Sequence, residues 1–303
     1  MTENHLYHQP VLLQEAVEAL QIAADGIYVD VTFGGGGHSK AILEQLGNFG
    51  RLIAFDQDQD ALQNTFTDSR FTFVPHNFKH LKRFLRLYNI NQVDGILADL
   101  GVSWHQFNTP NRGFSIRFGS EALDMRMSAD NELSAYEVLN KYPAENLAQI
   151  FKDFGDIPNA RKLANAIVQE RKKRPVDTIQ QLLVLAEPLC IGKPQQYLAR
   201  VFQAVRMEVN KEVAALQALL EQSVEALRTG GLLVVISYHS VEDRMVKNFI
   251  KTGSIDGIVQ RDLYGNSNIP LVGVNKKIIT PTENEIRQNP KASSAKMRVA
   301  RKK

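Results

Sequence analysis

The chain has 303 residues, of which 44% are hydrophobic and 23% charged, and its 36 basic and 33 acidic side chains give a formal net charge of +3. This composition excludes collagen-like, coiled-coil and intrinsically disordered chains, and the length suits one large domain with an insertion, or two domains. A single cysteine, Cys190, excludes an intrachain disulfide and a zinc site built from several cysteines, and favours a reducing compartment. The apolar runs are too short for a membrane span and residues 1–9 lack a signal-peptide pattern, so we expect a cytoplasmic protein with no membrane partner.

The first hundred residues alternate short apolar runs with helical spacing. Four runs rich in Val, Ile, Leu and Phe have the length of parallel strands buried on both faces: 27–31, 51–55, 71–74 and 93–98. The segments between them have the apolar spacing of helices: 39–46, 57–67 and 79–88. This order predicts a doubly wound α/β sheet whose strands end at one edge, where the ligands of such sheets bind.

The first strand leads into four glycines, residues 34–37, which are followed by His38 and a helix. Glycine lets the backbone turn sharply and lets a ligand approach the main chain, so Gly36 and Gly37 are candidate contacts of a nucleotide-like ligand. A plain tight turn is the alternative. At the start of the helix, His38 could flank a methionine carboxylate or simply pack there.

Asp56 ends the second strand, twenty residues after Gly36. A carboxylate in this position can accept hydrogen bonds from a ribose diol, although it could also cap the next helix. Both a dinucleotide and S-adenosylmethionine satisfy this pattern. In the dinucleotide fingerprint the third glycine would be Ser39, which is small enough to keep that interpretation open.

The fourth strand ends at Asp99, on the edge where we expect the glycine turn. A carboxylate there can accept an N–H of a substrate amine or complement a sulfonium charge, whereas its alternative role is to bond the amides of a turn.

After this strand the pattern becomes helical and predicts an inserted domain over 106–210, whereas 1–105 and 211–303 form the ligand-binding domain. The predicted helices of the insertion are 134–141, 144–154, 159–171, 178–189 and 194–209. A helix over 212–228, closed by Gly230 and Gly231, precedes a strand over 232–237, and 276–279 and 295–301 are candidates for the last strands.

The surroundings of Cys190 bear on the possible chemistry. Methylation of a pyrimidine at C5 requires a reactive thiolate, but Cys190 ends an apolar helix with no cation beside it. Direct attack of a nitrogen or oxygen on a methyl group needs only alignment and a dry site, so neither a metal nor a covalent intermediate is implied. An exocyclic amine is the natural acceptor.

Several motifs in order resemble the bacterial small-subunit ribosomal RNA methyltransferase H family over nearly the whole chain. The shared segments are 10–13 with Glu15, 32–34 and 36–38, 94–97 and 99–103, 112–115, 123–127, 202–206 with 209–210, 236–240 with 242–244, 289–290 and 294–296. The resemblance implies a Rossmann-like class I methyltransferase sheet with an inserted all-helical, substrate-recognition domain. It also implies N4-methylation of a cytidine in the decoding region of 16S ribosomal RNA from S-adenosylmethionine, with the small ribosomal subunit as partner.

The family's cofactor residues carry over by position. They match Gly36, Gly37, His38, Asp56, Phe78, Asp99 and Gln106. The family often has Gly-Val-Ser-Ser-Pro-Gln where this chain has Trp104 and His105 before Gln106, so the loop that carries Gln106 could differ. Trp104 could stack on a base or pack in the core.

We assign Asp99 and His239 to catalysis. His239 follows the predicted strand 232–237, where it could accept the proton released after methyl transfer or bond the cytosine; alternatively, it caps the next helix. Three other residues are candidate RNA contacts with salt-bridge or capping alternatives: Arg206, Asn210 and Arg244. The basic run 171–174 and the basic residues of the tail become candidate RNA surfaces. The tail residues are Lys291, Lys296, Arg298, Arg301, Lys302 and Lys303. A nicotinamide-dependent oxidoreductase and a non-catalytic ribosome-assembly factor remain the competing functions.

Overall fold

The computed structural model describes residues 10–262, 264–267, 269–275 and 277–303. The chain divides into two compact units: Met1–Gly101 with Ala214–Lys303, called the sheet unit, and Val102–Val213, called the helical unit. Each unit has its own core and is described by itself.

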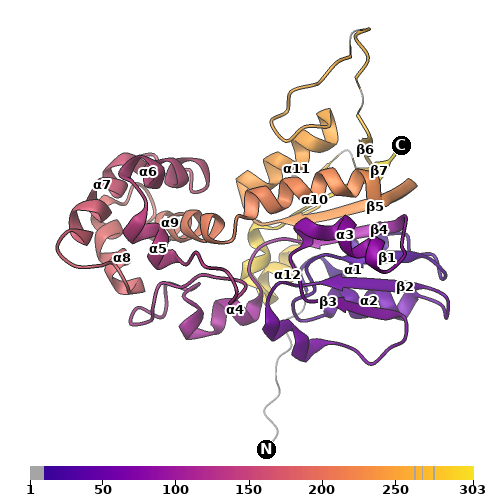
Figure 1. Ribbon diagram of the computed structural model, residues 1–303, viewed down its shortest axis with the longest axis horizontal. Helices are drawn as coiled ribbons and strands as arrows, with labels where there is room; N and C mark the ends of the chain where they lie inside the picture. The colour runs from indigo at the N-terminus through magenta and orange to yellow at the C-terminus, as the bar shows by residue number, and fades with distance from the viewer. Residues whose placement is uncertain (1–9, 263, 268, 276) are drawn as a thin grey trace, which may run out of the picture. The chain divides into compact units, whose positions relative to one another are not determined.

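The sheet unit contains a sheet with the strand order β3-β2-β1-β4-β5-β7-β6 (Figure 1). Its strands are β1 (Ile27–Asp30), β2 (Arg51–Phe55), β3 (Phe71–Val74), β4 (Val93–Asp99), β5 (Leu227–Ser237), β6 (Leu271–Gly273) and β7 (Lys296–Lys302). Strands β1 to β5 pair in parallel, whereas β7 is antiparallel to both β5 and β6. The predicted α/β sheet and its first four strands are confirmed.

The register of the parallel strands brings their carboxyl ends to one edge. Asp30, the last residue of β1, pairs with Ala54 on one side and Leu97 on the other. Asp99, the last residue of β4, pairs with Ile236 near the end of β5. Because the strands are buried on both faces, as their Val, Ile, Leu and Phe content predicts, the polar residues at their ends are the first groups that can meet a ligand.

Helices α1 (Leu13–Ala19) and α2 (Gly37–Gln45) pack on this sheet through one core cluster. Val17 and Ile42 from the helices lie in this cluster with Leu97 and Val234 from the central strands. The remaining helical elements are η1 (Gln59–Asn64), η2 (Phe78–His80), α3 (Leu81–Leu87), α10 (Glu212–Ala226), α11 (Ser240–Thr252), α12 (Glu283–Gln288) and η5 (Pro290–Ser294). The helix predicted over 57–67 is only the 3-10 turn η1, because Asp58 caps it and accepts from the amide of Asp60.

The carboxyl-terminal half of the sheet unit differs from the prediction in two places. Helix α10 ends at Ala226 and β5 begins at Leu227, because Leu227 pairs with Val93 of β4; Gly230 and Gly231 lie inside β5 rather than closing a helix. The strand predicted over 276–279 is wrong: β6 lies at Leu271–Gly273, and Ile279 makes only an isolated bridge. Lys276 lies outside the described residues.

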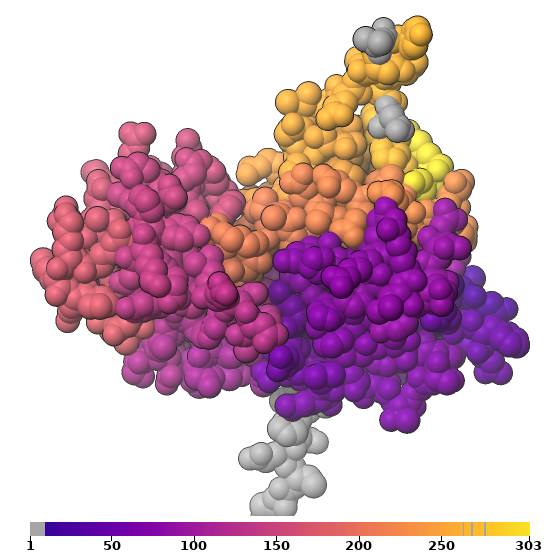
Figure 2. Space-filling view, in the orientation of Figure 1, coloured from indigo at the N-terminus to yellow at the C-terminus, as the bar shows by residue number. Residues whose placement is uncertain are grey.

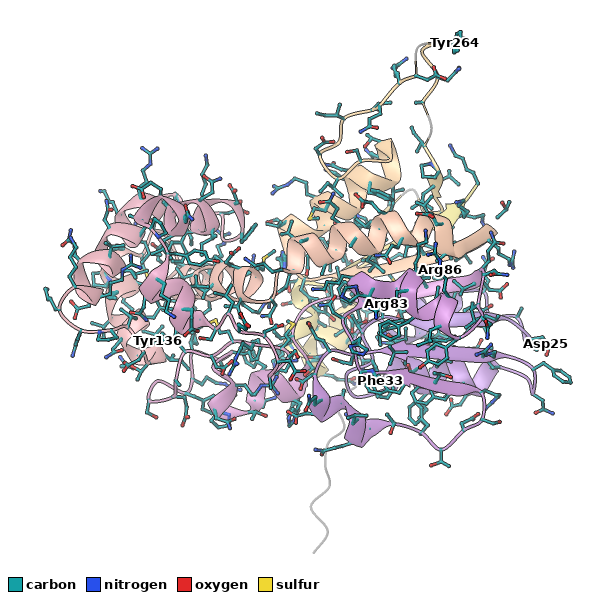
Figure 3. The ribbon with its side chains drawn as sticks, in the orientation of Figure 1. Asp25, Phe33, Arg83, Arg86, Tyr136 and Tyr264 are labelled. Carbon is teal, nitrogen blue, oxygen red and sulfur yellow. The ribbon has the colours of Figure 1, made fainter. Side chains whose placement is uncertain are left out.

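The described part of the segment between α11 and β6 stands away from the rest of the sheet unit (Figure 2). Tyr264 lies at its tip (Figure 3) and is 90% exposed. Tyr264 therefore adds nothing to the core of this unit.

The helical unit is built from helices around its own core. They are α4 (Trp104–Asn108), η3 (Pro110–Arg112), α5 (Ala135–Lys141), α6 (Ala144–Asp153), α7 (Ala160–Arg171), α8 (Ile179–Ala186), η4 (Glu187–Leu189) and α9 (Pro194–Val209). Helix α6 buries Leu147, Ile150 and Phe151, whose spacing forms one helix face. Thr178 starts α8 in a capping box with Gln181. The five predicted helices of the insertion are confirmed to within a few residues at their ends.

Candidate cofactor and substrate site

The glycine turn connects β1 to α2. Gly34 and Gly36 have φ angles of 52° and 77°, in the left-handed region that favours glycine, and Gly36 is the N-cap of α2. A Cβ on Gly36 would lie 2.9 Å from Phe66, and one on Gly37 would lie 2.1 Å from Pro10, so the packing of the protein itself requires both glycines. A Cβ on Gly35 meets no atom within 4 Å. The open side of this turn is therefore at Gly35, one residue before the predicted contacts.

A cluster of phenylalanine rings packs around the residue that precedes the glycine turn. Phe33, labelled in Figure 3, packs against Phe66, Phe71 and Phe73 with ring centroids 5.7, 5.5 and 5.3 Å apart. Such edge and tilted ring contacts stabilise a fixed arrangement. The turn is thus held by the core rather than being a loose loop.

Three carboxylates lie at the edge where the parallel strands end. Asp56 Oδ2 accepts from the amide of Gly34 at 2.8 Å, and its Oδ1 accepts from the amide of Asp58 at 2.8 Å. Asp30, which is 1% exposed, accepts from the hydroxyl of Ser39 at 2.7 Å and from the amide of Thr32 at 3.0 Å. Asp56 therefore fixes the glycine turn and is not the N-cap of η1.

Asp99 is joined by hydrogen bonds to Thr32, which also bonds Asp30, and to Tyr238. Its amide donates to Thr32 Oγ1 at 2.6 Å, and its Oδ1 accepts from the Tyr238 hydroxyl at 2.8 Å. Its Oδ2 lies 3.9 Å from His38 Nδ1. The structure thus brings together Asp99, His38, Asp56 and the glycine turn, four of the features that the sequence predicted for one site.

The electrostatics of this edge are unusual. Burial, with a smaller contribution from repulsion by the Asp30 carboxylate, raises the pKa of Asp56 to about 6 and that of Asp99 to about 7. Burial also raises the pKa of Asp30. Among the described residues, no lysine or arginine pairs with any of the three. The edge is therefore an acidic site without its own counter-charge.

His38 does not supply that counter-charge. Burial lowers its pKa to about 4, so the ring is neutral at physiological pH. The ring bonds to the backbone of Val11, and its Nε2 is buried without a hydrogen-bond partner in the part of the chain that the structure describes. An unpartnered buried nitrogen costs free energy unless a ligand meets it.

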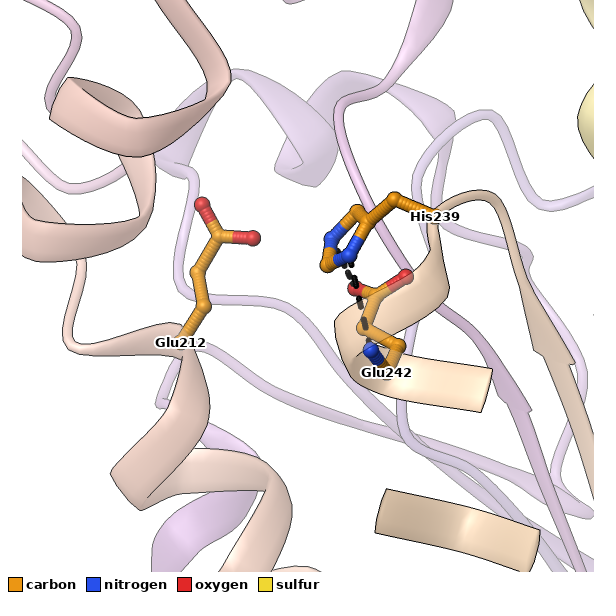
Figure 4. A group of neighbouring side chains, drawn as sticks. All are labelled: Glu212, His239 and Glu242. Carbon is orange, nitrogen blue, oxygen red and sulfur yellow. Dashed lines mark hydrogen bonds and ion pairs between the residues drawn. The ribbon is translucent and has the colours of Figure 1, made fainter. Parts of the chain in front are cut away.

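His239 follows β5 and is the N-cap of α11 (Figure 4). Its Nδ1 accepts from the amide of Glu242 at 3.4 Å, and its Nε2 lies 3.1 Å from Glu242 Oε1. This is the capping role that the sequence left open as the alternative.

Phe78 begins η2, four residues after the end of β3 at Val74, and is half-buried. Asn77 beside it donates to Gln57 Oε1 at 2.8 Å and so ties the end of β3 to the end of β2. Phe78 is thus placed on a fixed turn.

Gln106 belongs to the helical unit. It is the N3 residue of α4, and its Oε1 accepts from the amide of Ser103 at 3.1 Å while its own amide donates to Ser103 Oγ. Trp104 beside it is 50% exposed. Gln106 therefore has a structural role in a capping box, and its contact with a cofactor stays a prediction.

Two of the candidate RNA contacts have structural partners in the helical unit. Arg206 makes two hydrogen bonds to Glu212, at 2.8 and 2.9 Å. Asn210 is buried and bonds the backbone of Met125 and Met127. For these two residues the salt-bridge and capping alternatives are the observed ones, whereas Arg244 in the sheet unit is exposed.

Of the predicted basic surfaces, only part is free. In the run 171–174, Arg171 donates to Leu139 O, and Arg174 and Lys173 pair with Glu170. The basic tail is strand β7 rather than a frayed end. There Arg298 donates two hydrogen bonds to the carboxylate of Asp243, and its contact with RNA stays a prediction.

Two residues of this site escaped the sequence analysis: Asp30 and Tyr238. Asp30 carries the same signal as Asp56 and Asp99, an acid at the end of a buried strand, and could have been found by it. Tyr238 has no such signal, because its contact with Asp99 joins residues 139 positions apart.

Cys190 behaves as predicted: burial raises the pKa of its thiol, which disfavours a thiolate.

Comparison with known proteins identifies relatives of the whole chain. A family model described as the MraW methylase family matches residues 5–303. A protein of Christiangramia forsetii named ribosomal RNA small subunit methyltransferase H is 54% identical over 297 residues, covering 98% of each chain. One of the same name from Flavobacterium johnsoniae is 52% identical over 303 residues, covering 100% of each.

The solved structures that match the chain are more distant in sequence. An rRNA methylase from Streptococcus thermophilus is 12% identical, covers 96% of this chain and 93% of that chain, and has a TM-score of 0.40. TrmN from Thermus thermophilus is 10% identical, covers 96% of this chain and 48% of that chain, and has a TM-score of 0.44. Among the described residues, no helix has the length and apolar character of a membrane span.

Proposed function

The chain belongs to the MraW methylase family, and from this premise we propose that it transfers a methyl group from S-adenosylmethionine to 16S ribosomal RNA of the small subunit. The acceptor is the exocyclic N4 amine of a cytidine in the decoding region, as the resemblance of the motifs implies. The observation that carries the proposal is the acidic edge of the sheet, where three carboxylates with raised pKa values lack a cationic partner among the described residues.

The residues present fit this cofactor. S-adenosylmethionine carries a positive sulfonium and a positive amino group, which complement uncompensated carboxylates. The open side at Gly35 lets a ligand reach the backbone, and the unpartnered Nε2 of His38 offers a buried acceptor. The residues we propose for cofactor binding are Gly36, Gly37, His38, Asp56, Phe78 and Asp99, with Gln106 as the family's seventh position.

Each residue has a defined task in this proposal. Asp56 retains free lone pairs for a ribose diol while it fixes Gly34, and Phe78 offers an apolar wall to adenine. The cofactor supplies an activated methyl group when bound. Asp99 accepts an N–H of the cytidine amine and orients the nitrogen lone pair, which lowers the entropic cost of attack.

Methyl transfer to an amine releases one proton from the nitrogen. We propose His239 as its acceptor, because the imidazole lies at the end of β5 and Glu242 holds it in place. No metal and no covalent enzyme intermediate are part of this mechanism.

The helical unit is proposed to bind RNA and the sheet unit to bind the cofactor. Small ribosomal subunits incubated with the protein and radiolabelled S-adenosylmethionine, followed by mass mapping of modified nucleosides, test the function. Label at one cytidine N4 is the expected result. No label at all would favour an assembly factor, and binding of a nicotinamide cofactor instead of S-adenosylmethionine in equilibrium dialysis would favour an oxidoreductase.

A further inference from the structure

Tyr238 is the one side chain among the described residues that donates a hydrogen bond to the Asp99 carboxylate. It follows β5 directly, and its hydroxyl donates to Asp99 Oδ1 at 2.8 Å. Its position is fixed twice more: its amide donates to Glu242 Oε2 at 3.2 Å, and its ring packs on the core beside Gly101. The hydroxyl therefore meets Asp99 from a rigid support.

This hydrogen bond makes the two oxygens of Asp99 different. Oδ1 faces the phenol, whereas Oδ2 lies 3.9 Å from the ring of His38, beyond hydrogen-bond distance. The neutral His38 leaves Oδ2 without a charged partner among the described residues. A donor such as an amine N–H can therefore bind Asp99 in one defined direction.

The hydrogen bond from Tyr238 also affects the charge of Asp99, because it lowers the pKa of this carboxyl group. Burial and the charges of Asp30 and Glu242 raise its pKa, and the hydrogen bond from Tyr238 opposes them. The phenol cannot take over the charge, because burial and the neighbouring carboxylates of Asp99, Glu242 and Glu285 raise the pKa of Tyr238 well above its usual value. Tyr238 thus remains a donor across the physiological range.

We infer that Tyr238 is a positioning residue of the proposed methyltransferase: its hydroxyl holds Asp99 Oδ1 and leaves Oδ2 as the acceptor for the substrate amine. The inference rests on the proposed function. Removal of the hydroxyl should leave Asp99 in place, but the Asp99 carboxylate should be less precisely oriented and its pKa should rise.

Tyr238→Phe tests this inference, because it keeps the ring and removes only the hydroxyl. Titration of carbon-13-labelled aspartate by NMR in the ligand-free protein should show the Asp99 pKa near 7 in the wild type and higher in the variant. The kcat at pH 7 should fall by about tenfold, the loss should shrink at higher pH, and the KM for S-adenosylmethionine should change less than kcat.

Tyr142→Phe is the matched control. Its hydroxyl donates to Glu208 Oε1 at 2.7 Å in the helical unit, so the variant removes an equivalent bond away from the acidic edge and should keep the wild-type pH profile.

Should Tyr238→Phe fold poorly, Asp99→Asn gives a second measurement: the phenol of Tyr238 should then titrate closer to its usual range. If the wild type is active and the pKa of Asp99 is the same in Tyr238→Phe, the inference is overturned but the proposed function stands. An inactive wild type would overturn the function, and the NMR titration would still decide whether Tyr238 controls Asp99.

Discussion

Carboxylates of the helical unit and those at the ligand edge of the sheet unit have opposite surroundings. In the helical unit Asp124 makes two hydrogen bonds to Arg126, at 2.9 and 2.8 Å, and Glu212 pairs in the same way with Arg206. At the ligand edge of the sheet unit, Asp30, Asp56 and Asp99 have no such partner among the described residues, and burial raises their pKa values.

This difference between paired and unpaired carboxylates indicates where the folded state is less stable in favour of function. A paired carboxylate at low exposure supports the fold, whereas a buried carboxylate without a counter-charge costs free energy in the absence of ligand. Other acids of the sheet unit do have a cationic partner, as Asp243 has in Arg298 and Asp94 has in Arg228. Buried carboxylates without a counter-charge are typical of binding and catalytic sites.

The largest expected effect comes from Asp99→Asn, which removes the acceptor for the amine but keeps the shape. We expect methyl transfer to small subunits to fall by about 100-fold or more, the scale of removing one aimed electrostatic contact. Asp124→Asn in the helical unit is the control, and should reduce the melting temperature while kcat is retained. An equal fall of kcat in both variants would remove the functional distinction between the two sets of carboxylates.

Substitutions in the glycine turn separate packing from ligand binding. Gly36→Ala should destabilise the protein by roughly 1–2 kcal/mol or more, because its φ of 77° and the nearby Phe66 both oppose a Cβ. Gly35→Ala should leave the unfolding free energy almost unchanged but weaken S-adenosylmethionine binding in calorimetry, because its Cβ would point into open space. A Gly35→Ala protein with wild-type affinity would mean that the ligand does not approach this side of the turn.

The raised pKa values also predict how stability depends on pH. Asp56 and Asp99 titrate near 6 and 7 in the folded chain but near 3.8 when unfolded, so the folded state binds more protons between these values. The free energy of unfolding should therefore fall as pH rises from about 4 to 7. Asp99→Asn should raise the melting temperature of the ligand-free protein at pH 8, by about 2–4 °C for each kcal/mol recovered, and should flatten the pH dependence. Thermal unfolding at several pH values measures this, and an unaltered slope would contradict it.

The smallest effect concerns the basic segments. Lys172→Gln with Lys173→Gln should reduce the slope of log affinity for RNA against log salt by about 0.7–0.9 for each phosphate that these lysines neutralise, without a change in cofactor affinity. Arg298→Gln should lower stability instead, because Arg298 pairs with Asp243 within the sheet unit. The reverse result would show that β7, and not the run 171–174, meets RNA.

Much of the fold could be predicted from local pattern. Runs such as 51–55 are apolar on both faces, and the helices of the insertion have clear apolar spacing and capping residues such as Thr178. The errors occurred where long-range pairing overrides local preference. Gly230 and Gly231 resemble a helix end in the sequence, but pairing of Leu227 with Val93 draws them into β5.

The candidate site was predicted in the same uneven way. Asp56, Asp99 and the glycine turn stand at strand ends, where sequence order alone implies a shared edge. Gln106 was found by its position in the family, and His239 as a polar residue that follows the fifth strand. Their capping bonds were not foreseen for Gln106 and were only an alternative for His239. Residues 171–174 and 296–302 showed that charge in a sequence does not reveal whether a partner neutralises it.

The sequence by itself determined the chemical inventory of this protein: parallel strands ending in acids, a glycine turn, an inserted set of helices and one unreactive cysteine. These follow from local spacing and residue type, which need no knowledge of distant neighbours. Only the tertiary structure decided which charges stand alone and which are paired, and that Tyr238 meets Asp99. Burial and hydrogen bonding depend on residues far apart in the chain, and they set the pKa values on which the chemistry depends.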